Sequence, residues 1–154
     1  MKKVFVIAVA LCGLFQSCSK NYESKILGTW ECEELVVTTT TDGQSEEHVY
    51  TKEDDGDIRT MVFRGNDTCI DTYYSSLPVT YSNKFLYSFD GDYLVLTSGS
   101  GSLRYKIESL SSSEFVFSNT MIGQTTYDSP EPQEYDTMKE IYTMKPRLIS
   151  AKNP

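Results

Sequence analysis

The hydrophobic and polar positions divide the chain at Cys18. Before it, residues 4–15 are almost entirely apolar and follow two lysines at the N-terminus. This run is too short to span a bilayer as a stable helix, which needs roughly 20 apolar residues. A cationic start, a short apolar segment and a small residue before the cleavage site are typical of a secretory signal peptide. The pattern therefore predicts a signal peptide over residues 1–17.

Residues 18–24 are polar and lack apolar periodicity, which predicts a disordered tether. From Lys25 onward the apolar positions recur at every second residue, the period of a half-buried β-strand. The clearest case is Phe85, Tyr87 and Phe89, after which Asp90-Gly91 turns the chain into the next apolar segment. Aspartate and glycine tolerate the left-handed backbone that such a tight hairpin turn requires. The ordered domain is therefore expected to begin near residues 25–27.

Turn signals divide this domain into about eight strands, and no segment has a convincing helical period. The paired Glu33-Glu34 interrupts the first strand and predicts a bulge there. The acidic stretch 42–57 and the polar stretch 118–137 are expected to be loops. The predicted strands are 27–41, 59–64, 68–74, 84–89, 92–96, 103–108, 114–117 and 138–144. Antiparallel up-and-down hairpins with one apolar face can close into an all-β barrel, which removes exposed strand edges.

The net charge of the chain limits which macromolecules it can bind. The formal net charge of −8 becomes −10 when Lys2 and Lys3 leave with the signal peptide. A nucleic-acid-binding surface needs a basic stripe to face the phosphates, and the sequence has none. Nucleic acid is therefore excluded as a partner, and the acidic surface is interpreted as a source of solubility.

Cys12 lies in the predicted signal peptide and Cys18 directly follows it, so Cys32 and Cys69 are the two cysteines of the patterned domain. They are too far apart in sequence for a zinc knuckle or a Cys-x-x-Cys redox pair. A secreted protein permits a disulfide between them. Two separate buried thiols are the alternative, because a free cysteine packs as a small hydrophobic residue.

Two sets of motifs resemble known families. The segment Phe15-Gln16-Ser17-Cys18 resembles a lipobox, the signal by which bacteria attach lipid to a cysteine, and this implies lipidation of Cys18. Most of residues 25–147 is similar to the lipocalin-like domains of bacterial lipoproteins, which are calycin-type β-barrels. The matching segments, in order, are Leu27-Gly28-Thr29-Trp30 with its Gly-x-Trp, Phe63–Thr68, Tyr87–Leu96, Tyr105–Ser111 and Tyr142–Arg147.

This resemblance implies an eight-stranded lipocalin-like barrel over residues 25–147, followed by a tail over 148–154. In calycins the opening Trp caps one end of the barrel near an Arg, here Trp30 and Arg147. An eight-stranded barrel is just wide enough to be filled by side chains or to hold one small ligand. The residues expected to face the interior, and so to contact a ligand, are Trp30, Phe63, Phe89, Leu94, Leu96, Tyr105 and Phe117.

No catalytic, metal or cofactor site is expected. His48 is the only histidine and lies in the acidic stretch 42–57 beside Glu46 and Glu47. Without a second histidine or a plausible nucleophile arrangement, a solvated side chain is the better interpretation. The acidic run Glu53–Asp57 lacks the glycine and terminal glutamate spacing of a calcium loop. We therefore interpret it as a solvated charge run and do not expect an enzyme.

The leading functional hypothesis is a lipid-anchored protein that binds a small apolar or amphipathic molecule in the barrel mouth, gated by the segments 42–57 and 118–137. The alternative is a protein-interaction or inhibitor module that binds a cationic partner through these acidic segments. The expected location is the bacterial cell envelope, on the outer membrane facing the periplasm, with surface exposure left open.

Overall fold

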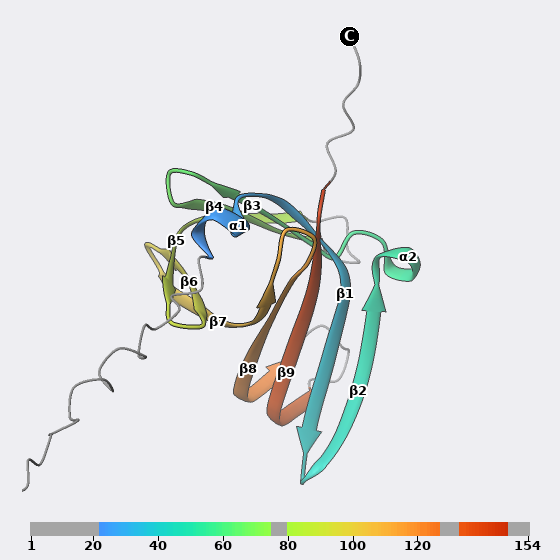
Figure 1. The fold of residues 1–154 in the computed structure, drawn as a ribbon. Coiled ribbons are helices and arrows are strands. Elements are labelled where there is room, and N and C mark those ends of the chain that lie inside the picture. The colour runs from blue at the N-terminus through green and yellow to red at the C-terminus, as the bar shows by residue number, and fades with distance from the viewer. Residues whose placement is uncertain (1–21, 75–79, 127–132, 148–154) are drawn as a thin grey trace, which may run out of the picture.

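The computed structural model describes residues 22–74, 80–126 and 133–147. The predicted signal peptide, Cys18, the tether up to residue 21 and the tail 148–154 lie outside the described residues. Figure 1 shows an antiparallel β structure with two one-turn helices, α1 (Glu23–Ile26) and α2 (Lys52–Asp55). The strands are β1 (Gly28–Thr41), β2 (Gln44–Thr51), β3 (Arg59–Arg64), β4 (Thr68–Tyr74), β5 (Thr80–Asp90), β6 (Tyr93–Ser98), β7 (Gly101–Leu110), β8 (Phe115–Thr126) and β9 (Gln133–Pro146).

The sheet closes on itself through β1 and β9. Its strand order is β2-β1-β3-β4-β5-β6-β7-β8-β9, and β1 also pairs with β9. The first four residues of β1 pair with β3, whereas residues 34–41 of β1 pair with β2 on that same side. The closed barrel therefore consists of β1 and β3 to β9, eight antiparallel strands, and β2 lies beside it. The predicted all-β barrel of eight strands is confirmed.

The predicted acidic loop over residues 42–57 is wrong, because half of it is the strand β2 and the helix α2 follows directly. Asp42 and Gly43 have positive φ values of 51° and 75° and form the tight turn between β1 and β2. The two strands then pair from Thr41 opposite Gln44 to Glu34 opposite Thr51. Most of β2 is exposed, so its side chains carry no apolar alternation that would have revealed a strand. Helix α2 follows, and the side chain of Thr51 caps it by accepting a hydrogen bond from the Asp54 N–H.

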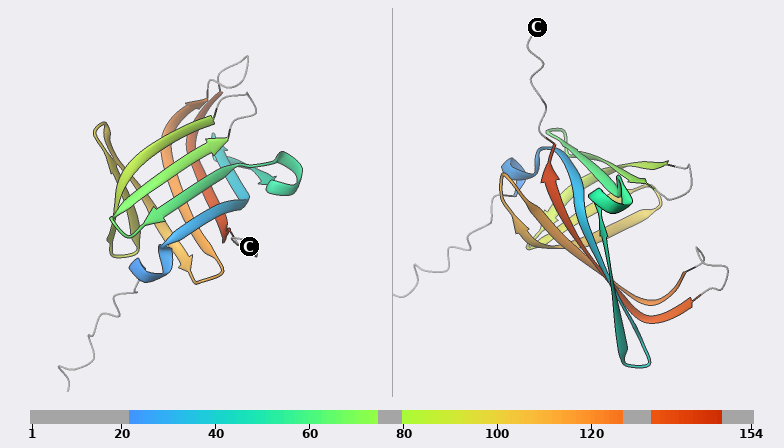
Figure 2. Two further views of the ribbon diagram at one scale, coloured as in Figure 1. Left: turned by 90° about the horizontal axis from the view of Figure 1, so that it is seen from above. Right: turned by 90° about the vertical axis from the view of Figure 1, so that its right-hand side faces the viewer.

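The predicted loop over residues 118–137 is also wrong over most of its length. Strands β8 and β9 pair from Phe115 opposite Met144 to Thr126 opposite Gln133, well past the last buried residue of either strand. Together with β1 and β2 they form a long twisted extension that projects beyond the barrel (Figures 1 and 2). Residues 127–132, including Pro130 and Pro132, lie outside the described part of the chain.

Several local predictions are confirmed. The register of β1 against β9 shifts between Cys32 and Glu34, which is the bulge expected at Glu33-Glu34. Strands β3 and β4 have the predicted bounds, and Asp67 between them has a φ of 58°. Gly91 has a φ of 59° in the predicted turn between β5 and β6.

Helix α1 lies at the end of the barrel where β1 begins (Figure 2). Ile26 is fully buried, and the Trp30 Nε1–H donates a 2.7 Å hydrogen bond to the Ile26 carbonyl oxygen. The Tyr22 ring packs 5.4 Å from that of Phe89, and its hydroxyl donates to Asp92. Residues 22–24 therefore belong to the folded domain. The expectation that they form part of a disordered tether is wrong. No helix in the described residues is long and apolar enough to cross a membrane.

Candidate functional site

The barrel interior contains a buried ion pair between Arg59 and Asp71. Both residues occupy inward positions of the alternating strands β3 and β4, where Arg59 lies opposite Tyr73 and Asp71 opposite Met61. The guanidinium makes two parallel hydrogen bonds to the carboxylate, from Nε to Oδ1 at 2.9 Å and from Nη2 to Oδ2 at 2.7 Å. Both side chains are fully enclosed. Burying two charges is costly unless each is compensated, and here each compensates the other.

Four aromatic rings surround the guanidinium. Its Cζ atom lies 4.4 Å from the ring centre of Tyr73, 4.7 Å from Tyr142, 4.9 Å from Tyr105 and 5.2 Å from Phe117. Such distances allow cation–π attraction, which is strongest where water is excluded. The Nη2 group also donates to the Tyr105 hydroxyl at 3.1 Å, and that hydroxyl lies 3.3 Å from the Tyr73 hydroxyl. The ring faces therefore fix the guanidinium in one orientation.

One nitrogen of this guanidinium, Nη1 of Arg59, is buried and has no hydrogen-bond partner among the described residues. A buried donor without an acceptor costs free energy, about 1–3 kcal/mol or more for a charged group. Buried polar groups in folded proteins nearly always have a partner, and an exception calls for a ligand, a water or an ion. The Nη1 group is therefore a donor of this cluster whose partner would be a water or a bound molecule.

Glu140 adds a second carboxyl group to the cluster. It precedes Tyr142 by two positions on β9, and the Tyr142 hydroxyl donates to its Oε2 at 3.1 Å. Burial raises the pKa of Glu140, although the hydrogen bond from Tyr142 and the charge of Arg59 oppose the shift. Burial also raises the pKa values of Tyr73 and Tyr142, so both phenols stay neutral. For Arg59, burial alone would lower the pKa, but the hydrogen bonds and charge of Asp71 raise it well above its ordinary value.

A partly apolar face leads from this cluster onto the extension. Side chains directly opposite each other in an antiparallel pair lie on the same face of the sheet. Leu35 and Phe117 lie opposite Tyr142, and the next inward pairs along β9 bring Val37 to Glu140 and Met121 to Met138. Leu35, Val37, Met121 and Met138 are all half-buried. The same face also carries Thr39 opposite Met138 and Asn119 opposite Glu140, so the inner surface continues past Arg59 as a partly covered wall of mixed apolar and polar side chains.

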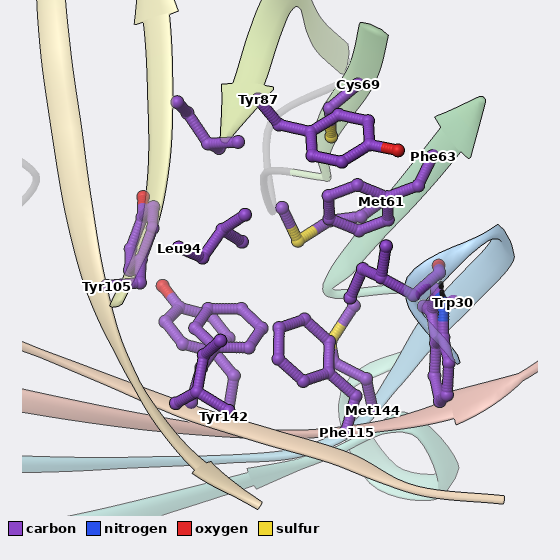
Figure 3. Packing of buried hydrophobic residues seen from close by; sticks show 14 of the residues in the cluster. Trp30, Met61, Phe63, Cys69, Tyr87, Leu94, Tyr105, Phe115, Tyr142 and Met144 are labelled. Atoms are coloured by element: carbon purple, nitrogen blue, oxygen red, sulfur yellow. Dashed lines mark hydrogen bonds between the residues drawn. The ribbon is translucent and has the colours of Figure 1, made fainter. Parts of the chain in front are cut away.

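The residues predicted to contact a ligand lie mainly in the packed core (Figure 3). Trp30, Phe63, Leu94, Leu96, Tyr105 and Phe117 are buried, and Phe89 is partly buried against the same cluster. Ring contacts connect them: Trp30 and Phe63 both pack against Phe115, whose ring lies 4.8 Å from that of Phe117. Tyr105 alone among the seven hydrogen-bonds to Arg59. A direct contact of these residues with a ligand stays a prediction.

Sequence reasoning missed Arg59, Asp71 and Glu140. A signal for the first two was present, because they stand at inward positions of the alternating runs Arg59-x-Met61-x-Phe63 and Cys69-x-Asp71-x-Tyr73. A charged residue in phase with buried apolar ones must be paired or functional. Glu140 gave the same signal, because it lies in phase with Met138, Tyr142 and Met144 within the predicted strand 138–144.

The other predicted features lie away from this cluster. Arg147 pairs with Glu31 at 3.3 Å and is largely exposed, whereas the buried Trp30 packs edge-on against Phe115. His48 is exposed, 3.5 Å from Glu46. The thiols of Cys32 and Cys69 are free and buried, in agreement with the second of the two cysteine expectations. In the part of the chain that the structure describes, no group of three His, Cys, Asp or Glu side chains is placed to hold a metal ion.

A hollow of about 400 Å³ lies between the start of β5 and the β6–β7 hairpin. Its apolar wall consists of Phe85 and Leu103, and the rest of the lining is polar. None of its lining residues belongs to the Arg59 cluster, although Leu103 precedes Tyr105 by two positions on the same face of β7. The hollow therefore borders the cluster without containing it.

The chain is similar to a known protein family and to solved structures. A family model described as a lipocalin-like domain matches residues 26–117, more than half of the chain. A lipocalin-like protein from Bacteroides uniformis has 14% sequence identity and a TM-score of 0.45, over 79% of this chain and 98% of that one. An uncharacterized protein from Bacteroides eggerthii has 13% identity and a TM-score of 0.41, over 78% of this chain and 98% of that one. No curated protein matches the chain. On the family match, this chain belongs to the lipocalin-like domain family.

Proposed function

We propose that this protein is a lipid-anchored binding protein that holds a small amphipathic molecule in the barrel, with the polar group of that molecule at Arg59. The observation that carries the proposal is the buried Nη1 donor of Arg59, which has no partner among the described residues. An oxygen atom of a bound molecule would satisfy it. A few placed polar groups within an apolar wall are the usual construction of a small-molecule site.

The direction of entry follows from what fills each end of the barrel. Helix α1, Trp30 and the aromatic core fill the end where β1 begins. On the other side of Arg59, the half-buried Leu35, Val37, Met121 and Met138 continue toward the extension. The apolar part of the ligand would lie against this wall, because removing apolar surface from water provides roughly 25 cal/mol per Å².

The anchor belongs to the same proposal. Cys18 lies four residues before Tyr22, the first described residue, so a lipid on Cys18 would hold the barrel close to a membrane surface. Stable attachment to a bilayer needs more than one acyl chain, which a fully modified lipoprotein cysteine provides. The proposed location is therefore the bacterial cell envelope. Cys18→Ser should move the protein from the membrane fraction to the soluble fraction, and continued incorporation of labelled fatty acid by this variant would refute the assignment.

The ligand itself is tested by co-purification. The protein is isolated from its native envelope, and solvent extracts are compared by mass spectrometry with those of an Arg59→Met/Asp71→Leu variant. Replacing a buried ion pair by apolar side chains of similar volume is often neutral for folding, so this variant removes the donor and keeps the barrel. We expect a molecule that is at least tenfold depleted in the variant. Equal amounts in both extracts, or none in either, would contradict the proposal.

A further inference from the structure

The charges around Arg59 limit which polar group this site accepts. Asp71 occupies both Nε and Nη2 of the guanidinium with two hydrogen bonds, at 2.9 Å and 2.7 Å, so the positive charge is already balanced inside the barrel. Glu140 interacts electrostatically with the same guanidinium and brings a second carboxyl group to the cluster. Among these three side chains the formal charge is zero when Glu140 is protonated and negative when it is ionised.

A carboxylate ligand would therefore be a poor fit. It would place another negative charge in a buried region where Asp71 has already neutralised Arg59, and attraction to the cation would be offset by repulsion from the existing carboxylate. The rings of Tyr73, Tyr105, Phe117 and Tyr142 also cover the guanidinium with their electron-rich faces. These faces attract cations and repel anions.

A neutral oxygen acceptor has none of these costs. A carboxamide, ester or hydroxyl oxygen accepts one hydrogen bond from Nη1 and leaves the Arg59–Asp71 pair intact. We propose that the site selects amphipathic molecules whose polar group is an uncharged oxygen acceptor, and that Asp71 is the residue that determines this preference against carboxylates. This inference rests on the proposed function, since it names the ligand class of the same site.

The test uses a set of probes that share one alkyl chain and differ in the polar group. Octanamide, octan-1-ol and octanoate are titrated by calorimetry at about pH 8, where free carboxylic acids are ionised. The chain from Ser19 to Pro154 is used, because the closed barrel and its complete buried cluster lie within residues 22–147. We expect octanamide and octan-1-ol to bind at least tenfold more tightly than octanoate.

Asp71→Asn provides the sharpest contrast, because it removes the neutralising charge and keeps the side-chain shape. Octanoate should then bind at least tenfold more tightly than it does to the parent, while octanamide changes less than threefold. The matched control is Asp90→Asn, which disrupts an exposed pair with Arg104 beside the ring of Tyr93 and should change neither probe. If Asp71→Asn does not fold, Glu140→Gln serves in its place, with octanoate affinity rising and octanamide affinity held.

The outcomes separate the two levels of the proposal. Octanoate bound as tightly as octanamide, with both lost in Arg59→Met/Asp71→Leu, overturns the neutral-acceptor inference and leaves the proposed function in place. Binding of none of the probes, or binding that survives in Arg59→Met/Asp71→Leu, overturns both.

Discussion

Arg59 and Asp71 form a two-point ion pair in the barrel interior, whereas Arg104 and Asp90 form a pair of the same chemistry on its surface. The first pair is fully enclosed, and the second has side chains that are 53% and 69% exposed. Each guanidinium lies over at least one tyrosine ring, at 4.4 Å for Tyr73 and 4.0 Å for Tyr93. The two pairs share the same charges and a tyrosine ring, and they differ in burial and in the number of hydrogen bonds to the guanidinium, so the surface pair serves as a control.

Removing one partner should be costly only in the interior. Asp71→Ala leaves the Arg59 charge buried and unpaired, and we expect it to lower the free energy of unfolding by about 3–5 kcal/mol. Asp90→Ala should lower it by no more than about 1 kcal/mol, because water screens an exposed pair. Urea denaturation measures both changes. Similar losses for the two variants would show that the interior pair is not enclosed as described.

Glu140 should make the stability of the barrel depend on pH. Because burial raises its pKa in the folded protein, the folded state holds the proton more tightly than the unfolded state does. Stability is then lost as the pH rises from the ordinary value of 4.5 through the raised folded value. Glu140→Gln, which still accepts the Tyr142 hydrogen bond, should match the parent below this window and exceed it above. Urea midpoints measured across the window check this, and parallel curves for the two proteins would contradict it.

The packing of helix α1 against the barrel should contribute to the free energy of unfolding. Ile26→Ala removes a fully buried side chain beneath Trp30, and such deletions cost about 2–5 kcal/mol. The neighbouring Leu27→Ala is the control, because Leu27 is 47% exposed and a surface substitution is usually within about 0.5 kcal/mol. Fluorescence of Trp30, the only tryptophan, follows unfolding in both. An Ile26→Ala protein as stable as Leu27→Ala would mean that the packing of α1 makes no such contribution.

The two buried thiols should report on opening of the barrel. Burial raises the pKa values of Cys32 and Cys69 to about 12, so almost no reactive thiolate is present at neutral pH. In the chain from Ser19 to Pro154, iodoacetamide should label neither cysteine under native conditions and both in urea. Mass spectrometry counts the added groups. Rapid labelling of either residue in the native state would contradict their burial.

The closed barrel was predictable from the sequence because apolar and polar residues alternate along its strands, and because its turns contain Asp, Asn and Gly. Strand β2 was not, because an edge strand exposed on both faces has no buried positions to produce a pattern. The end of β8 and the start of β9 were missed for a related reason. The part of β8 after Ser118 and the part of β9 before Tyr142 lie outside the core, so polar residues are tolerated there.

The candidate site was harder to predict than the fold. The apolar interior residues were identified from their period, but most of them pack against each other and fill the closed half of the barrel. The polar cluster depends on Arg59 meeting Asp71 across β3 and β4 and on Tyr105 and Tyr142 arriving from β7 and β9. Periodicity within one strand carries no information on which side chains converge from distant strands.

The most direct test of the central claim is the NMR signal of the Arg59 side chain. Its Nε–H is bonded to Asp71 inside the barrel and should exchange slowly enough to give a resolved resonance in ¹⁵N-labelled protein. Titration with octanamide should shift this resonance in a saturable manner, while the corresponding signal of the exposed Arg104, where visible, stays in place. A resonance that stays in place throughout the titration would show that octanamide does not bind at Arg59, which would contradict the account.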